Sequence, residues 1–201
     1  MTHNKTMKKR IIVARDSQHL VKLVNEEIEL HGSNCCLNHI ITSKVTDMSW
    51  LFDGTSFNGN IDLWDVSNVI NMRSMFSKTF FNQDISRWDV SNVTNMGSMF
   101  AHSSFNRDIG QWNVSNVANM DFMFANSVFN QDIFTWRPSK LITKENIFSG
   151  SAAGQENKVP YWALADIEFI PNVIEAYHLS AHLTNSLILE GAKADGKHVK
   201  I

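Results

Sequence analysis

Residues 88–100 have the sequence WDVSNVTNMGSMF, and closely related stretches begin at Trp64 and Trp112. Shifting the chain against itself by 24 residues superposes these stretches without an insertion. The rows that superpose include Trp64, Trp88, Trp112 and Trp136; Phe57, Phe81, Phe105 and Phe129; Met48, Met72, Met96 and Met120; and Phe52, Phe76, Phe100, Phe124 and Phe148. There are four full units, at 41–64, 65–88, 89–112 and 113–136, and a degenerate fifth ends near residue 150. A fixed period of this length is typical of units that stack on one another and share one core.

Each unit contains two patterns that predict regular structure. Ile85, Trp88 and Val90 fit the L-x-x-L-x-L spacing of leucine-rich repeats, and alternation along a short strand would point Trp88 and Val90 inward and Asp89 outward. The next stretch has the spacing of the buried face of a short helix, with Val93, Met96, Met99 and Phe100 as its apolar residues. The sequence therefore predicts an α/β fold, a right-handed leucine-rich-repeat-like solenoid of 24-residue strand and short-helix coils.

The two ends of the chain have the patterns of helical caps. Residues 1–40 predict a strand over 9–14 and a helix from Asp16 or Ser17 to about Leu30, stopped by Gly32. After the repeat segment 41–150, residues 151–201 are interpreted as a linker, a C-terminal helix over about 171–189 and a polar tail. Caps of this kind cover the open ends of a stack, which would otherwise invite aggregation.

Two alternatives compete with core packing for the repeated residues. The aromatic rows could stack on nucleobases and the methionine row could bind a soft metal such as copper, but the periodicity places both kinds of row inside the stack. The acidic row Asp84, Asp108 and Asp132, with Asn60 in the first unit, could bind calcium. Because Asx side chains also cap turns, and the row lacks the glycine-rich calcium pattern, we favour turn capping and leave calcium open.

The sequence contains only weak motifs of the kinds that indicate catalytic or metal sites. The chain has no glycine-rich phosphate loop and no nucleophile elbow. His178 and His182 stand at i and i+4 without an evident third zinc ligand, and Leu179 occupies the place of a zincin glutamate. The one cluster of thiols and imidazoles consists of His19, His31, His39, Cys35 and Cys36. We therefore predict a protein that is not an enzyme and needs no cofactor or metal, with a metal-dependent enzyme as the least favoured alternative.

The repeat motif resembles a known family. The phrase Trp-Asp-Val-Ser-Asn-Val-x-Asn-Met-x-x-Met-Phe, followed by Phe-Asn-x-Asp-Ile-x-x-Trp, resembles the BspA-like repeat, which is also known from mycoplasma surface lipoproteins. The resemblance covers about residues 41–150, and residues 36–41 resemble the entry segment of small bacterial members. It implies a bacterial leucine-rich-repeat-like solenoid that binds other macromolecules and has no catalytic residues. Many relatives are surface adhesins with export signals.

The composition and the charge limit the class of binding partner and the cellular compartment that the protein can have. Among 201 residues, 18 basic and 20 acidic side chains leave a net charge of −2, which argues against nucleic acid and against a polybasic membrane surface. Cys35 and Cys36 are adjacent, and a disulfide between them would close no useful loop. The apolar run at 11–14 is too short for a secretory signal, and no apolar run is long enough to span a membrane. We therefore expect a cytoplasmic protein.

Differences among the units indicate where a partner could bind. Positions that are identical in every coil are explained by the packing of one coil on the next. Positions that vary are not required for this packing. The candidate contacts on the predicted strand side, which is the usual binding surface of such folds, are Asp65, Arg87, Asp89, Gln111, Asn113, Phe134 and Arg137. The sequence predicts a protein-binding module of immunity, anti-defence or effector type, with a cell-surface adhesin as the alternative; neither the partner nor the oligomeric state is determined by the sequence.

Overall fold

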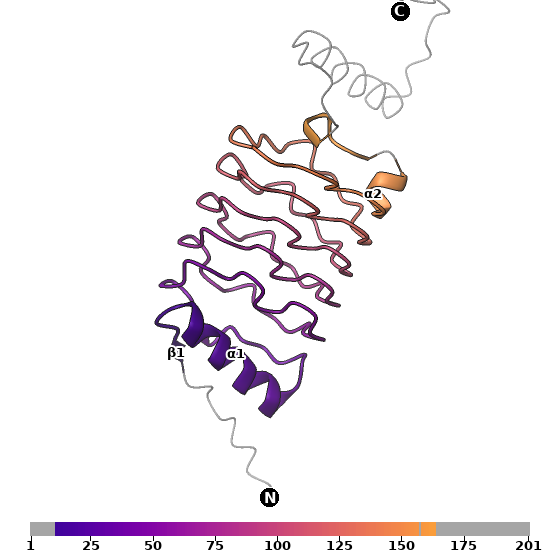
Figure 1. Ribbon diagram of the computed structural model, residues 1–201. Helices are drawn as coiled ribbons and strands as arrows, with labels where there is room; N and C mark the ends of the chain where they lie inside the picture. The colour runs from indigo at the N-terminus through magenta and orange to yellow at the C-terminus, as the bar shows by residue number, and fades with distance from the viewer. Residues whose placement is uncertain (1–10, 157, 164–201) are drawn as a thin grey trace, which may run out of the picture. The chain divides into compact units, whose positions relative to one another are not determined.

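The computed structural model describes residues 11–156 and 158–163, in which successive passes of the chain lie one above another (Figure 1). These residues belong to one compact unit, which ends at Ala163. The elements, in chain order, are β1 (Ile12–Val13), α1 (Ser17–His31), β2 (Ile40–Ile41), α2 (Ala152–Gln155) and the 3-10 helix η1 (Tyr161–Ala163). Between β2 and α2 the coils are built from turns and isolated backbone bridges rather than from long strands or helices.

Helix α1 closes the N-terminal end of the stack. The Asp16 side chain accepts a hydrogen bond from the His19 N–H at 2.8 Å and so caps the first turn. Gly32, with a φ of 81°, ends the helix and donates its N–H to the Ile28 carbonyl. Leu20, Leu23 and Val24 are buried in the common core, so α1 covers the first coil. Beside it, β1 pairs in parallel with β2, with Ile12 opposite Ile40 and Val13 opposite Ile41.

Backbone hydrogen bonds between coils are concentrated in one segment of each coil. We call this segment the ladder ribbon; it comprises residues 46–54 and the equivalent ranges 70–78, 94–102, 118–126 and 142–150. In the first four of these ranges, alternate N–H groups from the third residue on donate to a carbonyl of the following coil, for example Met72 to Asn95 at 2.9 Å and Phe76 to Met99 at 3.0 Å. At the start of the ribbon the direction is reversed, since the Ile70 N–H donates to the Thr46 carbonyl of the preceding coil at 2.8 Å. Parallel bridges in the ribbon link Asp47, Asn71, Asn95, Asn119 and Thr143 in succession.

The short helix expected in each coil is absent, and that part of the prediction is wrong. The ladder ribbon occupies the stretch concerned, and Ser98 and His102 have φ values of 57° and 55°, which an α-helix does not contain. Overlapping turns replace the helix, with Met99 donating to the Met96 carbonyl and Ala101 to that of Ser98, both at 3.1 Å. These turns present apolar side chains inward at nearly the helical spacing, so the residue pattern alone did not distinguish the two structures.

The strand expected around Trp88 is also not formed. The alternation of buried and exposed side chains that the strand predicted is nevertheless present. Trp88 and Val90 are 4% and 1% exposed, whereas Asp89 between them is exposed. The backbones of neighbouring coils are too sparsely paired on this side to form a regular strand; instead, the Trp88 indole donates to the Ile61 carbonyl at 3.3 Å. The other tryptophans of the row repeat this bond to the preceding coil.

The aromatic rows form the centre of the stack. Phe76 and Phe100 stack with ring centroids 5.7 Å apart, and within one coil Phe76 lies 4.1 Å from Phe81. The equivalent phenylalanines and methionines of the other coils are almost all fully buried. The prediction that the aromatic and methionine rows pack in the core is confirmed, because no face of these rows is open to a base or a metal.

Residues 149–156, which belong to the stretch that its composition marks as a linker, pack on the last coil. Ser151 caps α2, and Ala153 is fully buried and donates its N–H to the Phe129 carbonyl at 2.9 Å. Further on, the Trp162 ring lies 6.0 Å from that of Trp136, which continues the tryptophan row. The predicted helix at 171–189, with His178 and His182, and the polar tail lie outside the described residues.

Candidate partner-binding surface

The seven candidate contacts are all exposed and recur at fixed positions of successive coils. We call them the variable face, which consists of Asp65, Arg87, Asp89, Gln111, Asn113, Phe134 and Arg137. Asp65, Asp89, Asn113 and Arg137 form one row, with one residue from each of four coils, and Arg87 and Gln111 belong to a second row two positions earlier. Since neighbouring backbones in such a stack are about 4.8 Å apart, the rows form a continuous surface.

Three members of the first row also cap turns. Asp65 Oδ1 accepts hydrogen bonds from the Ser67 N–H at 3.1 Å and from the Ser67 hydroxyl at 2.7 Å. Asp89 and Asn113 accept the N–H two residues ahead at 3.0 and 3.1 Å. The hydrogen bonds from the side chain and the backbone of Ser91 hold the pKa of Asp89 below its ordinary value, so this carboxylate stays ionised at neutral pH. Turn capping therefore accounts for part of the reason why these three residues, which the sequence predicted as contacts with a partner, occupy this row.

Arg137 is held in place by its own coil and by η1. Its Nη1 donates to the carbonyls of Phe134 at 2.6 Å and Trp136 at 2.9 Å. The guanidinium also lies over the Tyr161 ring, 5.7 Å from the centroid, a cation–π arrangement. These contacts fix a positive charge at the C-terminal end of the row that begins with Asp65.

Arg87, Gln111 and Phe134 have fewer structural roles, and the case for contacts with a partner is strongest for them. Arg87 helps to lower the pKa of Asp84, so its charge lies near the acidic row. Gln111 lines a shallow depression of about 240 Å³ together with Asp108 and Asp132. The Phe134 side chain is 37% exposed, and its row has small or polar residues in the other coils. An exposed aromatic residue beside polar groups is a common anchor in protein interfaces.

The acidic row caps turns in the way the favoured interpretation requires. Asp84, Asp108 and Asp132 each accept the N–H two residues ahead, at 2.9, 2.8 and 2.8 Å, and Asn60 does the same at 3.0 Å. The backbone hydrogen bond from Ser86 is the main cause of the lowered pKa of Asp84. Across residues 11–156 and 158–163, no three His, Cys, Asp or Glu side chains are grouped so that they could hold a metal ion.

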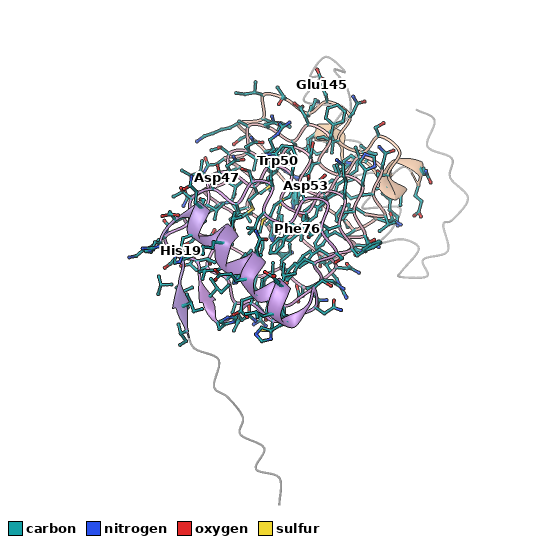
Figure 2. The ribbon with its side chains drawn as sticks, turned by 60° about the horizontal axis from the view of Figure 1, so that its bottom comes forward. His19, Asp47, Trp50, Asp53, Phe76 and Glu145 are labelled. Atoms are coloured by element: carbon teal, nitrogen blue, oxygen red, sulfur yellow. The ribbon has the colours of Figure 1, made fainter. Side chains whose placement is uncertain are left out.

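The imidazoles near the two cysteines pair with carboxylates and with α1. His39 Nε2 lies 3.3 Å from Glu27 Oε1, and His31 Nε2 lies 3.8 Å from Glu27 Oε2. His19 lies at the N-terminal end of α1, where its Nδ1 accepts from Arg15 (Figure 2). Cys35 is buried and Cys36 is exposed, and neither forms a disulfide. The structure therefore brings His31 and His39 to one carboxylate, that of Glu27, and places His19 at the other end of α1.

Two exposed aromatic residues on the ladder ribbon, Trp50 and Phe122, are not among the residues predicted from the sequence. Trp50 and Phe122 are 53% and 42% exposed and have φ values of 62° and 57°, in a row that otherwise holds serine or asparagine. The Arg73 guanidinium lies 5.8 Å from the Trp50 ring, and Trp50 lies between Asp47 and Asp53 on the ribbon beside α1 (Figure 2). Large side chains in this conformation cost about 1 to 3 kcal/mol. The change from Trp to Ser, Ser and Phe at this position in successive coils was the sequence signal that could have identified them as candidates for binding.

Comparison with known protein families gives a match over part of the chain. Residues 30–127 are similar to the family described as "Mycoplasma protein of unknown function, DUF285". The match begins near the end of α1 and extends into the fourth repeat unit, and it is consistent with a bacterial protein of the repeat type. No curated protein and no solved structure matches the chain. Within the part of the chain that is described, no helix is long and apolar enough to cross a membrane.

Proposed function

We propose that this protein is a non-catalytic scaffold that binds another protein through the variable face. The observation that supports the proposal most directly is the contrast between the two kinds of row. The inward rows hold the same buried aromatic and methionine side chains in coil after coil, whereas the exposed rows change from acidic to basic and from polar to aromatic. A rigid stack with a variable surface suits recognition of a protein partner.

The family resemblance supports the same function. BspA-like repeats bind other macromolecules, and the match over residues 30–127 fits a bacterial repeat protein. We propose a cytoplasmic interaction protein of bacterial or mobile-element origin, of the immunity, anti-defence or effector type. Cys36 is exposed and forms no disulfide, which is in keeping with a reducing compartment. Fractionation of the native host tests this assignment, because recovery at the cell surface would favour the adhesin alternative.

The binding proposal is tested with substitutions that the fold already accepts. Arg87→Gln introduces the residue found at the equivalent position 111, and Phe134→Ser introduces the residue found at position 86. We expect the double variant to keep the thermal midpoint of the wild type, because each new residue occupies the same exposed row elsewhere. Its capture of the partner from host extract should be weaker by about tenfold or more, as for loss of an interface anchor.

The matched control is Ile142→Thr. Ile142 is 82% exposed on the ladder ribbon, and threonine occupies the equivalent positions 46 and 94. This control removes an exposed apolar side chain outside the variable face, and we expect capture to be unchanged. If the double variant captures the same partner as the wild type while Ile142→Thr loses it, the binding surface is the ladder ribbon and the proposal is wrong.

A further inference from the structure

One row of the ladder ribbon is held by its backbone in each of the first four coils. We call it the charge row, and it consists of Ser49, Arg73, Gly97, Asp121 and Glu145. In those four coils the N–H of the row donates to the Asp or Asn side chain two residues earlier, at 2.8 to 3.1 Å. The same bond forms whether the row holds serine, arginine, glycine or aspartate. The capping of the turn therefore does not explain which side chains the row carries.

The charges of this row change sign along the stack. Arg73 is basic, Gly97 carries no side chain and Asp121 is acidic, in three successive coils. The Arg73 guanidinium lies over the Trp50 ring, 5.8 Å from its centroid, and no described residue forms a hydrogen bond or an ion pair with it. A β-carbon at Gly97 would lie 3.3 Å from Arg73 Nη1, so the guanidinium reaches the third coil. Asp121 accepts the Glu145 N–H at 2.7 Å but has no ion pair within the described ranges. Both charges are thus available to a partner.

The order of these charges is complementary to itself about the third coil. A two-fold axis that passes through Gly97 along the direction of the ribbon places the coils of a second copy opposite in reverse order. Arg73 in the second coil then faces Asp121 in the fourth coil of the second copy, and this pair occurs twice. Gly97 faces its own equivalent, where the absence of a side chain allows the two backbones to approach closely. An isologous dimer requires a surface that complements itself in this way.

The rows on either side of the charge row show the same complementarity in size. Phe122, which is 42% exposed, would face the coil that carries the small Ser74 at the equivalent position. Ile70, which is 50% exposed, would face Ala118. Each large side chain therefore meets a small one across the axis. Removal of these exposed apolar groups from water adds a favourable free energy that ion pairs at a surface supply only weakly.

We propose that the chain forms an isologous homodimer through the outer face of the ladder ribbon, with the two stacks antiparallel and two Arg73–Asp121 ion pairs across the axis. Five coils and nine residues per coil cover at most about 20 by 30 Å, so the dimer buries up to about 1,200 Å² in total. This area is at the lower end for specific interfaces, and we expect a reversible dimer with a Kd of about 10 to 100 µM. Asp47 and Glu145 lie in the end coils, at the rim, where they stay solvated.

The homodimer goes beyond the function proposed above and does not depend on it. No residue of the variable face belongs to the ladder ribbon, so each copy keeps its variable face exposed. Two such faces in one assembly allow bivalent binding to a partner that is itself oligomeric or repetitive, which raises the overall affinity without new contacts.

The test uses charge variants built from residues that the same row already holds. Arg73→Asp introduces the residue found at position 121, and Asp121→Arg introduces the residue found at position 73. Sedimentation equilibrium of the full-length chain between about 1 and 500 µM, at low ionic strength, measures the average mass. We expect the wild type to approach the mass of two chains. Each variant alone should dimerise at least about tenfold more weakly, because like charges then face each other.

An equimolar mixture of the two variants provides the decisive measurement. In the mixed dimer each substituted position faces an opposite charge, so the mixture should regain the affinity of the wild type. The matched control is Arg107→Gln, which introduces the residue found at positions 83 and 131 and changes a charge outside the ribbon. This control should dimerise like the wild type. Phe122→Ser, with the residue found at position 98, should weaken the dimer without a change of charge.

The homodimer is refuted if the wild type keeps the mass of one chain up to the highest concentration. It is also refuted if Arg73→Asp and Asp121→Arg each dimerise as tightly as the wild type, or if their mixture stays monomeric while both keep the wild-type thermal midpoint. Should a charge variant lose that midpoint, Phe122→Ser decides, and an unchanged dimer for it would count against the interface. Capture of a partner by the variable face is measured separately, so failure here leaves the function proposed above intact.

Discussion

Replacement of Trp88 by alanine tests the inward placement of the tryptophan row. The indole is 4% exposed, lies 6.2 Å from the Phe76 ring and donates to the Ile61 carbonyl at 3.3 Å. It therefore contributes apolar burial, an aromatic contact and the hydrogen bond that joins two coils. Because Trp64 and Trp112 occupy the same row above and below, the resulting cavity lies inside the stack and cannot be filled by solvent-exposed side chains.

The expected loss follows from the buried area. A buried tryptophan removes about 200 Å² from water, which at about 25 cal/mol per Å² corresponds to about 5 kcal/mol as an upper value. Alanine retains a small part of this area, while the cavity and the loss of the indole hydrogen bond to the Ile61 carbonyl add to the cost, so we expect a loss of about 3 to 5 kcal/mol. For a domain of this size the thermal midpoint should fall by about 6 to 20 °C.

Urea unfolding followed by circular dichroism measures this loss. The control is Trp88→Phe, which keeps an aromatic ring but removes the N–H, and it should cost about 1 to 2 kcal/mol. The slope of the transition must be compared as well, because weakening one coil of a stack can uncouple its two halves. A loss of less than about 0.5 kcal/mol for Trp88→Ala would match an exposed position and refute the inward placement.

Two further predictions concern backbone conformation and pH. Lys78 has a φ of 55° at the position where Gly54 and Gly150 have φ values of 66° and 67°. Because glycine adopts this left-handed conformation without strain, Lys78→Gly should raise the unfolding free energy by about 1 kcal/mol. A lower thermal midpoint for this variant would contradict the left-handed assignment. The hydrogen bonds from Ser86 keep the pKa of Asp84 below its ordinary value of 3.8 in the folded state, so its contribution to stability is complete above that value and is lost as the pH falls through the folded pKa. A thermal midpoint measured across this range should fall less steeply for Asp84→Asn than for the wild type, and identical curves would rule out this linkage.

Much of the candidate surface could be predicted because exposure depends on position within the repeat. Alternation around Trp88 placed Asp89 outward, and the structure leaves Asp89 and the other six candidates exposed. What could not be predicted is which of them also serve the fold. The contacts of Arg137 with the Phe134 carbonyl and the Tyr161 ring depend on η1, whose approach to the last coil is not encoded by any motif in the repeat.

The sequence by itself determined which residues face the core and which side chains stack between coils, because a constant 24-residue period brings identical residues such as Phe76 and Phe100 to equivalent positions. It also determined α1, whose capping residues Asp16 and Gly32 are local signals. Only the tertiary structure decided the backbone of the ladder ribbon. A helix and a series of turns can bury the same side chains, and the choice between them depends on where each N–H finds its acceptor. For Phe76 that acceptor is the Met99 carbonyl in the next coil, a partner that local sequence does not specify.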